Sequence, residues 1–132
     1  MWRSTINPAA VFDSVQFGFS QAVVTEGGRT IRISGQVGWD AERRLAGEDL
    51  ESQLAAAMGN LDAVLAAAGA TLAHVASLRI YVVEAAAADL APVGRVLRRS
   101  FPTDPPAATW LVVRGLADPG LLVEVEAAAV VP

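Results

Sequence analysis

The residues that could do chemistry in this chain are few in kind. Cysteine and lysine are absent, and His74 is the single histidine. Thiol catalysis, thiolate metal sites and a lysine Schiff base are therefore excluded, and metal binding is poorly supplied with ligands. His74 lies in GATLAHVASL, between an expected helix and an expected strand, and we interpret it as a surface loop residue rather than a general base.

A second place where chemistry is expected is the segment FPTDPPAATW, residues 101–110. Three prolines there end a helix-like segment before an apolar strand, at the kind of junction where chains often place a ligand-binding side chain. The strand opens with Ala107, Ala108 and Thr109, none of which is charged. Two interpretations stay open: a site that works without a charged anchor, or a site that has ceased to work.

Length and composition predict one soluble domain over residues 1–132. The net charge of −4 argues against a nucleic-acid partner, and all ten basic residues are arginines. The doublets Arg43-Arg44 and Arg98-Arg99 are interpreted as a solvated turn and a solvated helix end. No apolar run reaches the ~18 to 20 residues of a membrane span, and no export signal is recognised, so a cytoplasmic location without membrane contact is expected.

The pattern of apolar residues predicts the elements that must position any site. A hairpin is expected across Gly27 and Gly28, which supply positive-φ positions, and the long helix is expected to begin after Asp49 and to stop at Gly69. The predicted order is β-β-α-β-α-β-β, an α+β fold with both helices on one face of a five-stranded sheet. The predicted strands are residues 17–25, 30–35, 74–83, 108–116 and 121–131, and the helices 49–69 and 89–100.

The sheet face away from the helices is predicted to mix charged, aromatic and apolar residues. Such a mixture is typical of an interface, so we predict a homo-oligomer that packs sheet against sheet. In it, the charged residues would form ion pairs between subunits, and a catalytic role for one of them is the alternative. The residues assigned to this face are Arg32, Ser34, Ser77, Arg79, Tyr81, Ala108, Trp110, Val112, Arg114, Glu124 and Glu126.

Several short strings resemble the Rid family, the reactive intermediate deaminases also called YjgF or endoribonuclease L-PSP proteins. They are FSQAV before the hairpin, SGQV at the end of the second strand, Gln53, Asn60 and LAAAG along the long helix, FP and PPA before the fourth strand, and VEVEAAA in the fifth. Each string is weak alone, but together and in order they cover nearly the whole chain, from about residue 17 to residue 130.

The resemblance implies a chorismate-mutase-like fold and a homotrimer whose three sheets form a central barrel. It also implies a small-molecule pocket in each of three clefts between subunits. The activity it implies is hydrolysis of imines or enamines to a ketone and ammonia, with no metal or cofactor. Such a reaction requires mainly an oriented substrate and a polarised water.

The resemblance also implies roles for particular residues. Glu124 matches a glutamate that positions the attacking water, and the matching polar lining comes from Ser34, the backbone of Gly35 and Thr109. Active members carry an arginine directly after PA, which binds the substrate carboxylate through two hydrogen bonds. This chain has Ala108 at that position.

Two further departures make the expected pocket more apolar. Phe19 stands where many members have tyrosine, and Trp110 replaces a small side chain. Arg32, Arg79 and Arg114 are candidate replacement anchors. The favoured function is hydrolysis of a neutral or bulky imine rather than of a typical 2-iminoacid; a non-catalytic trimer that binds a metabolite or a protein is the alternative, and RNA cleavage ranks last.

Overall fold

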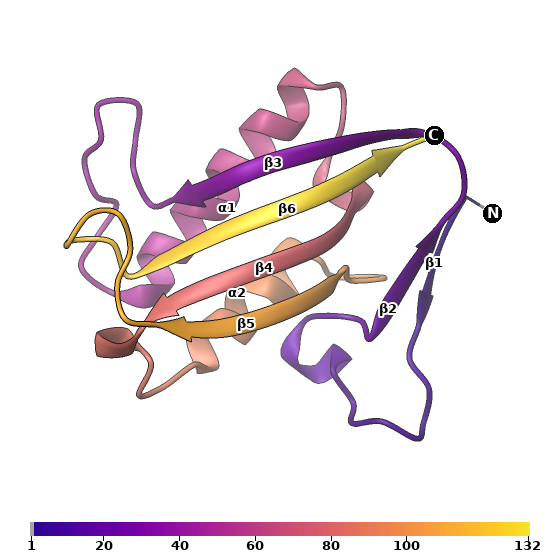
Figure 1. Ribbon diagram of the computed structural model, residues 1–132, viewed down its shortest axis with the longest axis horizontal. Helices are drawn as coiled ribbons and strands as arrows, with labels where there is room; N and C mark the ends of the chain where they lie inside the picture. The colour runs from indigo at the N-terminus through magenta and orange to yellow at the C-terminus, as the bar shows by residue number, and fades with distance from the viewer. Residues whose placement is uncertain (1) are drawn as a thin grey trace.

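The computed structural model describes residues 2–132. Its main feature is a four-stranded mixed sheet with the strand order β3-β6-β4-β5 (Figure 1). Strand β6 runs antiparallel to both of its neighbours, and β5 runs parallel to β4. The strands are β3 (Arg29–Val37), β4 (Val75–Val83), β5 (Ala107–Val113) and β6 (Val123–Val131).

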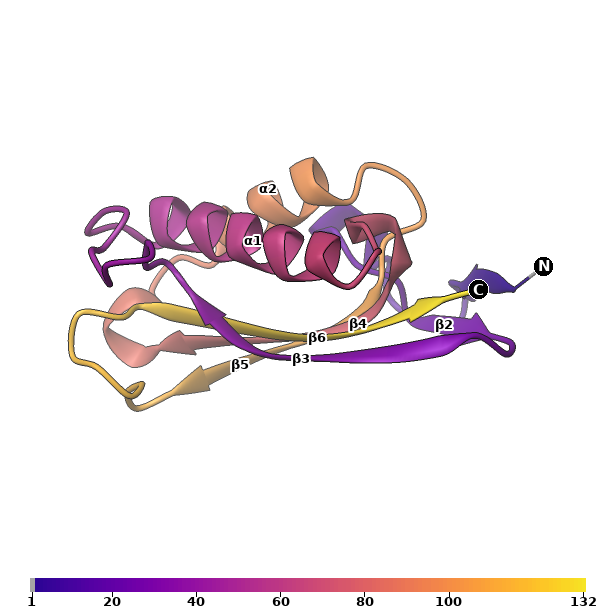
Figure 2. The same cartoon turned by 90° about the horizontal axis from the view of Figure 1, so that it is seen from above.

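Two helices, α1 (Leu50–Ala67) and α2 (Ala91–Ser100), cover one face of this sheet and leave the other face open (Figure 2). This confirms the predicted α+β arrangement. The carboxylate of Asp49 caps α1 by accepting a hydrogen bond from the Ser52 amide at 3.0 Å, and Gly69, with φ of 76°, ends the helical segment. Short 3-10 turns occur at Val15–Phe17 (η1), Leu72–His74 (η2) and Glu84–Ala86 (η3).

The core lies between the helices and the sheet. Leu54, Leu61 and Leu65 from α1 and Leu97 from α2 are fully buried, because their spacing places them on the helix faces turned toward the sheet. Ile80 of β4 is the buried strand counterpart at the centre of this cluster. Burial of each such side chain contributes roughly 1.5 to 3 kcal/mol, and this packing holds the two helices on the sheet.

The N-terminal hairpin differs from the prediction. Strand β2 (Ala22–Thr25) pairs with β1 (Arg3–Ile6) in a separate two-stranded sheet, so the expected fifth strand of the main sheet is absent among residues 2–132. Gly27 and Gly28 do have positive φ, at 65° and 82°. They link the two sheets, as Figure 1 shows, instead of closing a hairpin within one sheet. The four-residue β1 is too short to give a periodic signal.

The prediction for the side-chain direction of β5 was wrong. In the parallel pair β4/β5, Trp110 stands opposite Ile80 and Thr109 opposite Arg79, and directly paired residues point to the same face of a sheet. Ala108, Trp110 and Val112 therefore belong to the helix side, and Arg114 follows the last residue of β5. The run TWLVV is almost wholly apolar, so alternation could not show its register.

Candidate functional site

The open face of the sheet carries a β-bulge beside Glu124. The pairing of β3 with β6 shifts between Ile33 and Gln36, so that Ser34 and Gly35 face a single residue of β6, Glu126, while Gly35 contacts the side chain of Glu124. Bulges often occur next to active sites because they redirect side chains. A methyl group on Gly35 would lie 2.6 Å from the carboxyl carbon of Glu124, so the carboxylate packs directly on the glycine backbone.

Two hollows meet at this carboxylate. One has a volume of about 400 Å³ and the other, on the side of α1, about 530 Å³. Glu124 makes no hydrogen bond or ion pair with other side chains among residues 2–132, so its oxygens are free to bind a water or a ligand. Gly35 and Glu124 line both hollows; the first adds Tyr81, Val113, Gly115, Leu116 and Glu126, and the second includes Trp39, Asp40, Asn60 and Val64.

Glu126, two residues further along β6, is bound by two other side chains. The Tyr81 hydroxyl donates a short hydrogen bond to its Oε1, and Nη1 of Arg79 lies 3.8 Å from the same oxygen. The hydrogen bond to this carboxylate, followed by desolvation, raises the pKa of Tyr81 above its usual value. Of the two glutamates on this face, Glu124 is therefore the one available for chemistry.

The Tyr81 contact can be tested by titration, because Tyr81 is the only tyrosine in the chain. We expect Glu126→Gln to lower the pKa of Tyr81 toward the ordinary value of about 10, since the bond from the neutral hydroxyl to the carboxylate is lost. Absorbance at 295 nm against pH reports this shift directly.

The sign of the stability effect follows from the same shift. A folded-state pKa above the unfolded value means that the contact stabilises the protein below about pH 10, and that this contribution is lost as the pH rises through the folded-state pKa. Glu48→Gln, in the loop before α1, serves as the control and should leave the midpoint of the Tyr81 titration unchanged. If Glu126→Gln also left the Tyr81 titration midpoint unaltered, the contact between Tyr81 and Glu126 would be contradicted.

A second group of predicted site residues lies at the edge strand β5, on the helix side. The ring centroids of Phe19 and Trp110 are 5.9 Å apart, and those of Phe17 and Trp110 are 6.5 Å apart. The bridge between Ser20 and Ala107 fixes this arrangement. Ala108 is partly buried against the core, so a methyl group occupies the position where the resemblance implies an arginine.

The structure therefore divides the predicted residues into two groups on opposite faces. Glu124 and Thr109 are on the open face with the bulge of Ser34 and Gly35, whereas Phe19, Ala108 and Trp110 belong to the helix side. Neither hollow at Glu124 is lined by a member of the second group. We call these two groups the Glu124 half-site and the aromatic half-site, and within one chain they are separate.

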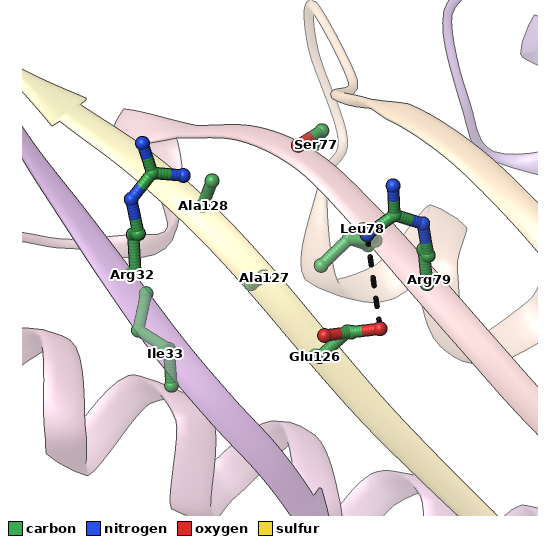
Figure 3. A pocket seen from close by; sticks show the side chains of 8 residues that line it. All are labelled: Arg32, Ile33, Ser77, Leu78, Arg79, Glu126, Ala127 and Ala128. Atoms are coloured by element: carbon green, nitrogen blue, oxygen red, sulfur yellow. Dashed lines mark ion pairs between the residues drawn. The ribbon is translucent and has the colours of Figure 1, made fainter.

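Two of the three candidate replacement anchors, Arg32 and Arg79, lie on the face opposite to Ala108. Arg32 and Arg79 line a shallow hollow of about 160 Å³ on the open face, where they stand on opposite sides of β6 (Figure 3). Arg79 pairs with Glu126, while Arg32 makes no ion pair within residues 2–132. Because Ala108 belongs to the other face, neither can replace an arginine there in the same chain.

Two amides from α1 hold the loops around Glu124. Gln53 is fully buried; its Nε2 donates to the carbonyls of Gly47 at 3.0 Å and Gly120 at 3.1 Å, and its Oε1 accepts from the Leu122 amide at 2.8 Å. Asn60 donates to the carbonyls of Val37, the last residue of β3, and of Trp39 in the loop after it, each at 2.8 Å. The sequence showed these residues only as part of the family pattern, with no structural role.

His74 lies outside both groups of candidate residues. Its Nδ1 accepts a hydrogen bond from the Thr71 amide at 2.9 Å, so the imidazole caps its own turn, as expected of a loop residue.

Within residues 2–132, no cluster of three or more acidic, histidine or cysteine side chains is placed to hold a metal ion. In the same part of the chain, no helix combines the length and the apolar character needed to cross a bilayer.

Comparison with known proteins gives the class of protein. Residues 13–131 match the family described as Endoribonuclease L-PSP. The structure is similar to that of YyfB, a Rid-family protein of Yersinia pestis, with 44% identity, a TM-score of 0.92 and coverage of 99% of this chain and 100% of that one. RidA from Psychrobacter sp. PAMC 21119 gives 29% identity and a TM-score of 0.72, covering 95% and 94% of the two chains.

A curated relative supports the same assignment. Protein DfrA of Myxococcus xanthus is 36% identical over 113 residues, which are 85% of this chain and 84% of that protein. The chain belongs to the Endoribonuclease L-PSP family, that is, the Rid family, as the sequence strings predicted.

Proposed function

We propose that this protein is a homotrimeric hydrolase that converts a neutral or bulky imine or enamine to a carbonyl compound and ammonia. The reaction would take place in a cleft between subunits, with Glu124 directing the water. The observation that carries this proposal is the state of Glu124: its carboxylate packs on the Gly35 bulge, lines two hollows and has no side-chain partner within residues 2–132.

The division into two half-sites supports assembly from several copies. Strand β5 is an edge strand of the sheet, and Val112 on it is 53% exposed. Unpaired edges and exposed apolar side chains are features that association covers. A neighbouring copy docked at β5 would bring its own Glu124 half-site toward the aromatic group of Phe19 and Trp110.

The chemistry needs only groups that this chain supplies. An iminium carbon is electrophilic; the water oxygen adds to it, the C=N π electrons move to nitrogen, and Glu124 accepts the proton that the water loses. Return of that proton to the nitrogen makes ammonia the leaving group. As the C–N bond breaks and the carbonyl forms, Glu124 accepts the remaining hydroxyl proton, which then passes to the released ammonia to give ammonium. A carboxylate free of other partners, as Glu124 is here, can make these transfers.

Substrate preference follows from the position of Ala108. Without an arginine there, a small 2-iminoacid loses a charged two-point contact worth roughly 1.5 to 3 kcal/mol. Phe19 and Trp110 offer apolar area in its place. The site is therefore expected to select substrates by their apolar bulk.

Ammonia release tests this proposal. We expect wild type to hydrolyse imines that carry an aromatic or branched side chain faster than 2-iminopropionate, and Glu124→Gln to reduce the rate by about 100-fold, the usual contribution of general acid–base catalysis. Ala108→Arg should raise the activity toward 2-iminopropionate. Freshly generated imines, coupled to an ammonia assay, provide the measurement.

Sedimentation of the same samples tests the trimer and controls for dissociation. Glu48→Gln, a change of the same chemistry outside both half-sites, should keep full activity. Glu124→Gln with unchanged rates would reject the assigned role. A protein that binds such imines but releases no ammonia would indicate a binding protein instead, and a monomer in dilute solution would remove the shared cleft.

A further inference from the structure

A groove between η1, α2 and β5 lies next to the aromatic half-site. It has a volume of about 460 Å³, and its walls come from Gln16, Phe17, Leu90, Ala91, Gly94, Arg95, Arg98 and Trp110. Ala108 precedes Trp110 by two residues on the same side of β5. The groove therefore lies near the position at which the family's arginine is missing, within about 7 Å along the strand.

The arginines at and near this groove differ in whether a carboxylate is paired with them. Arg95 and Arg99 both bind the carboxylate of Glu51, at 2.9 Å and 3.3 Å, and their charge is largely compensated. Arg98 donates through Nη1 to the carbonyl of Gln16 at 2.8 Å and has no carboxylate partner among residues 2–132. Of the two arginines that line the groove, Arg98 is thus the uncompensated one.

The local backbone leaves room for this guanidinium. A side chain at Gly94 would place its Cβ 3.1 Å from Nη1 of Arg98 and 3.5 Å from the carbonyl oxygen of Phe17. The absence of a side chain at Gly94 therefore lets Arg98 lie against α2 at the groove. Its hydrogen bond to a backbone carbonyl uses one donor of five, so the remaining donors can bind a ligand.

The apolar wall carries a donor without a partner. The indole nitrogen of Trp110 is buried and has no acceptor within the described residues. Phe17, 42% exposed, stands at an edge-to-face angle of 79° to Trp110. An exposed aromatic side chain against a second ring provides a surface on which a flat apolar group can pack.

We propose that this groove binds a small organic acid with an aromatic or similarly flat apolar body, and that Arg98 binds its carboxylate. The free guanidinium selects the acid, and Phe17 and Trp110 select the apolar body. The consequence for catalysis rests on the proposed function: the bulky imine would carry its acidic group toward Arg98 instead of toward position 108. Arg98 is then the residue that determines the substrate class.

Direct binding tests this without turnover. We use phenylacetate as the probe, phenylacetamide as its neutral match and acetate as the acid without a ring, each titrated by NMR or calorimetry. Wild type should bind phenylacetate at least tenfold more tightly than either of the other two. Arg98→Gln should weaken phenylacetate binding about tenfold or more and leave phenylacetamide unchanged.

Arg99→Gln is the matched control, since Arg99 is on the same helix but does not line the groove. Thermal unfolding of each variant shows that the fold is kept. Equal binding of the acid and the amide, equal effects of Arg98→Gln and Arg99→Gln, or no phenylacetate binding to the assembled protein would each overturn the assignment.

The binding test and the ammonia-release test can fail independently of each other. If phenylacetate binding depended on Arg98 but no imine released ammonia, the proposed hydrolysis would be rejected and the groove would stand as a binding site. Conversely, ammonia release could depend on Glu124 while Arg98→Gln hydrolysed bulky acidic imines at the wild-type rate. That result would reject the role of the groove and support the hydrolysis.

Discussion

Gly35→Ala should give a folded protein whose Glu124-dependent ammonia release falls by up to about 100-fold, the loss expected when Glu124 itself is replaced. The added methyl group would lie 2.6 Å from the carboxyl carbon of Glu124, so the carboxylate must swing away. The obstructing atoms belong to the end of a flexible side chain and φ of Gly35 is not positive, so the backbone can stay in place. Activity and thermal unfolding, measured on the same sample, separate the two effects.

Gly59→Ala is the matched control for this substitution. Gly59 lies within α1, and within residues 2–132 no atom other than those of its chain neighbours and the adjacent backbone of its own helix lies within 4 Å of where its Cβ would be. That variant should keep full activity and gain up to about 1 kcal/mol of stability, because alanine is the better helix former. Full activity in Gly35→Ala would show that the close packing of Glu124 on the bulge has no part in catalysis.

Gln53→Leu should reduce the free energy of unfolding by about 3 to 5 kcal/mol. The substitution leaves the carbonyls of Gly47 and Gly120 and the amide of Leu122 without their partner, and each unpaired buried group costs about 1 to 3 kcal/mol. Leucine nearly conserves the volume, so the loss reports the hydrogen bonds. Urea unfolding followed by tryptophan fluorescence measures it.

Gln21→Leu makes the same chemical change where the amide hydrogen bond is exposed, from Nε2 to the carbonyl of Phe12 at 2.9 Å. Its cost should stay below about 1 kcal/mol. If the two variants unfolded at the same denaturant concentration, the buried amide would have no special role. In that case the loops at Glu124 would depend on other contacts.

In the proposed function, the two half-sites together supply the groups that the reaction needs. The Glu124 side has a free carboxylate, a bulge and two hollows, one of them on the side of α1. The β5 side has aromatic walls and the free guanidinium of Arg98. In the proposed trimer, each cleft combines one of each, so a change in one half need not disturb the other.

The family, the order of elements from β2 onward, and the long helix with its cap at Asp49 and its stop at Gly69 could be predicted from the sequence alone, whereas β1 was missed. These are local features: periodicity, capping chemistry and positive-φ glycines act over a few residues, so they can be identified without tertiary information. The same is true of the alternation in β4 and β6, which correctly placed Arg79, Tyr81, Glu124 and Glu126 on the open face.

The pairing of β2, the side-chain direction in β5 and the difference between Arg98 and Arg99 could be seen only in the tertiary structure. An apolar run such as TWLVV has no alternation to fix its faces, and its register comes from the neighbouring strand β4. The doublet Arg98-Arg99 appeared as two equivalent solvated charges. It took the approach of Glu51, 48 residues away in sequence, to pair with Arg99 and leave Arg98 without a carboxylate.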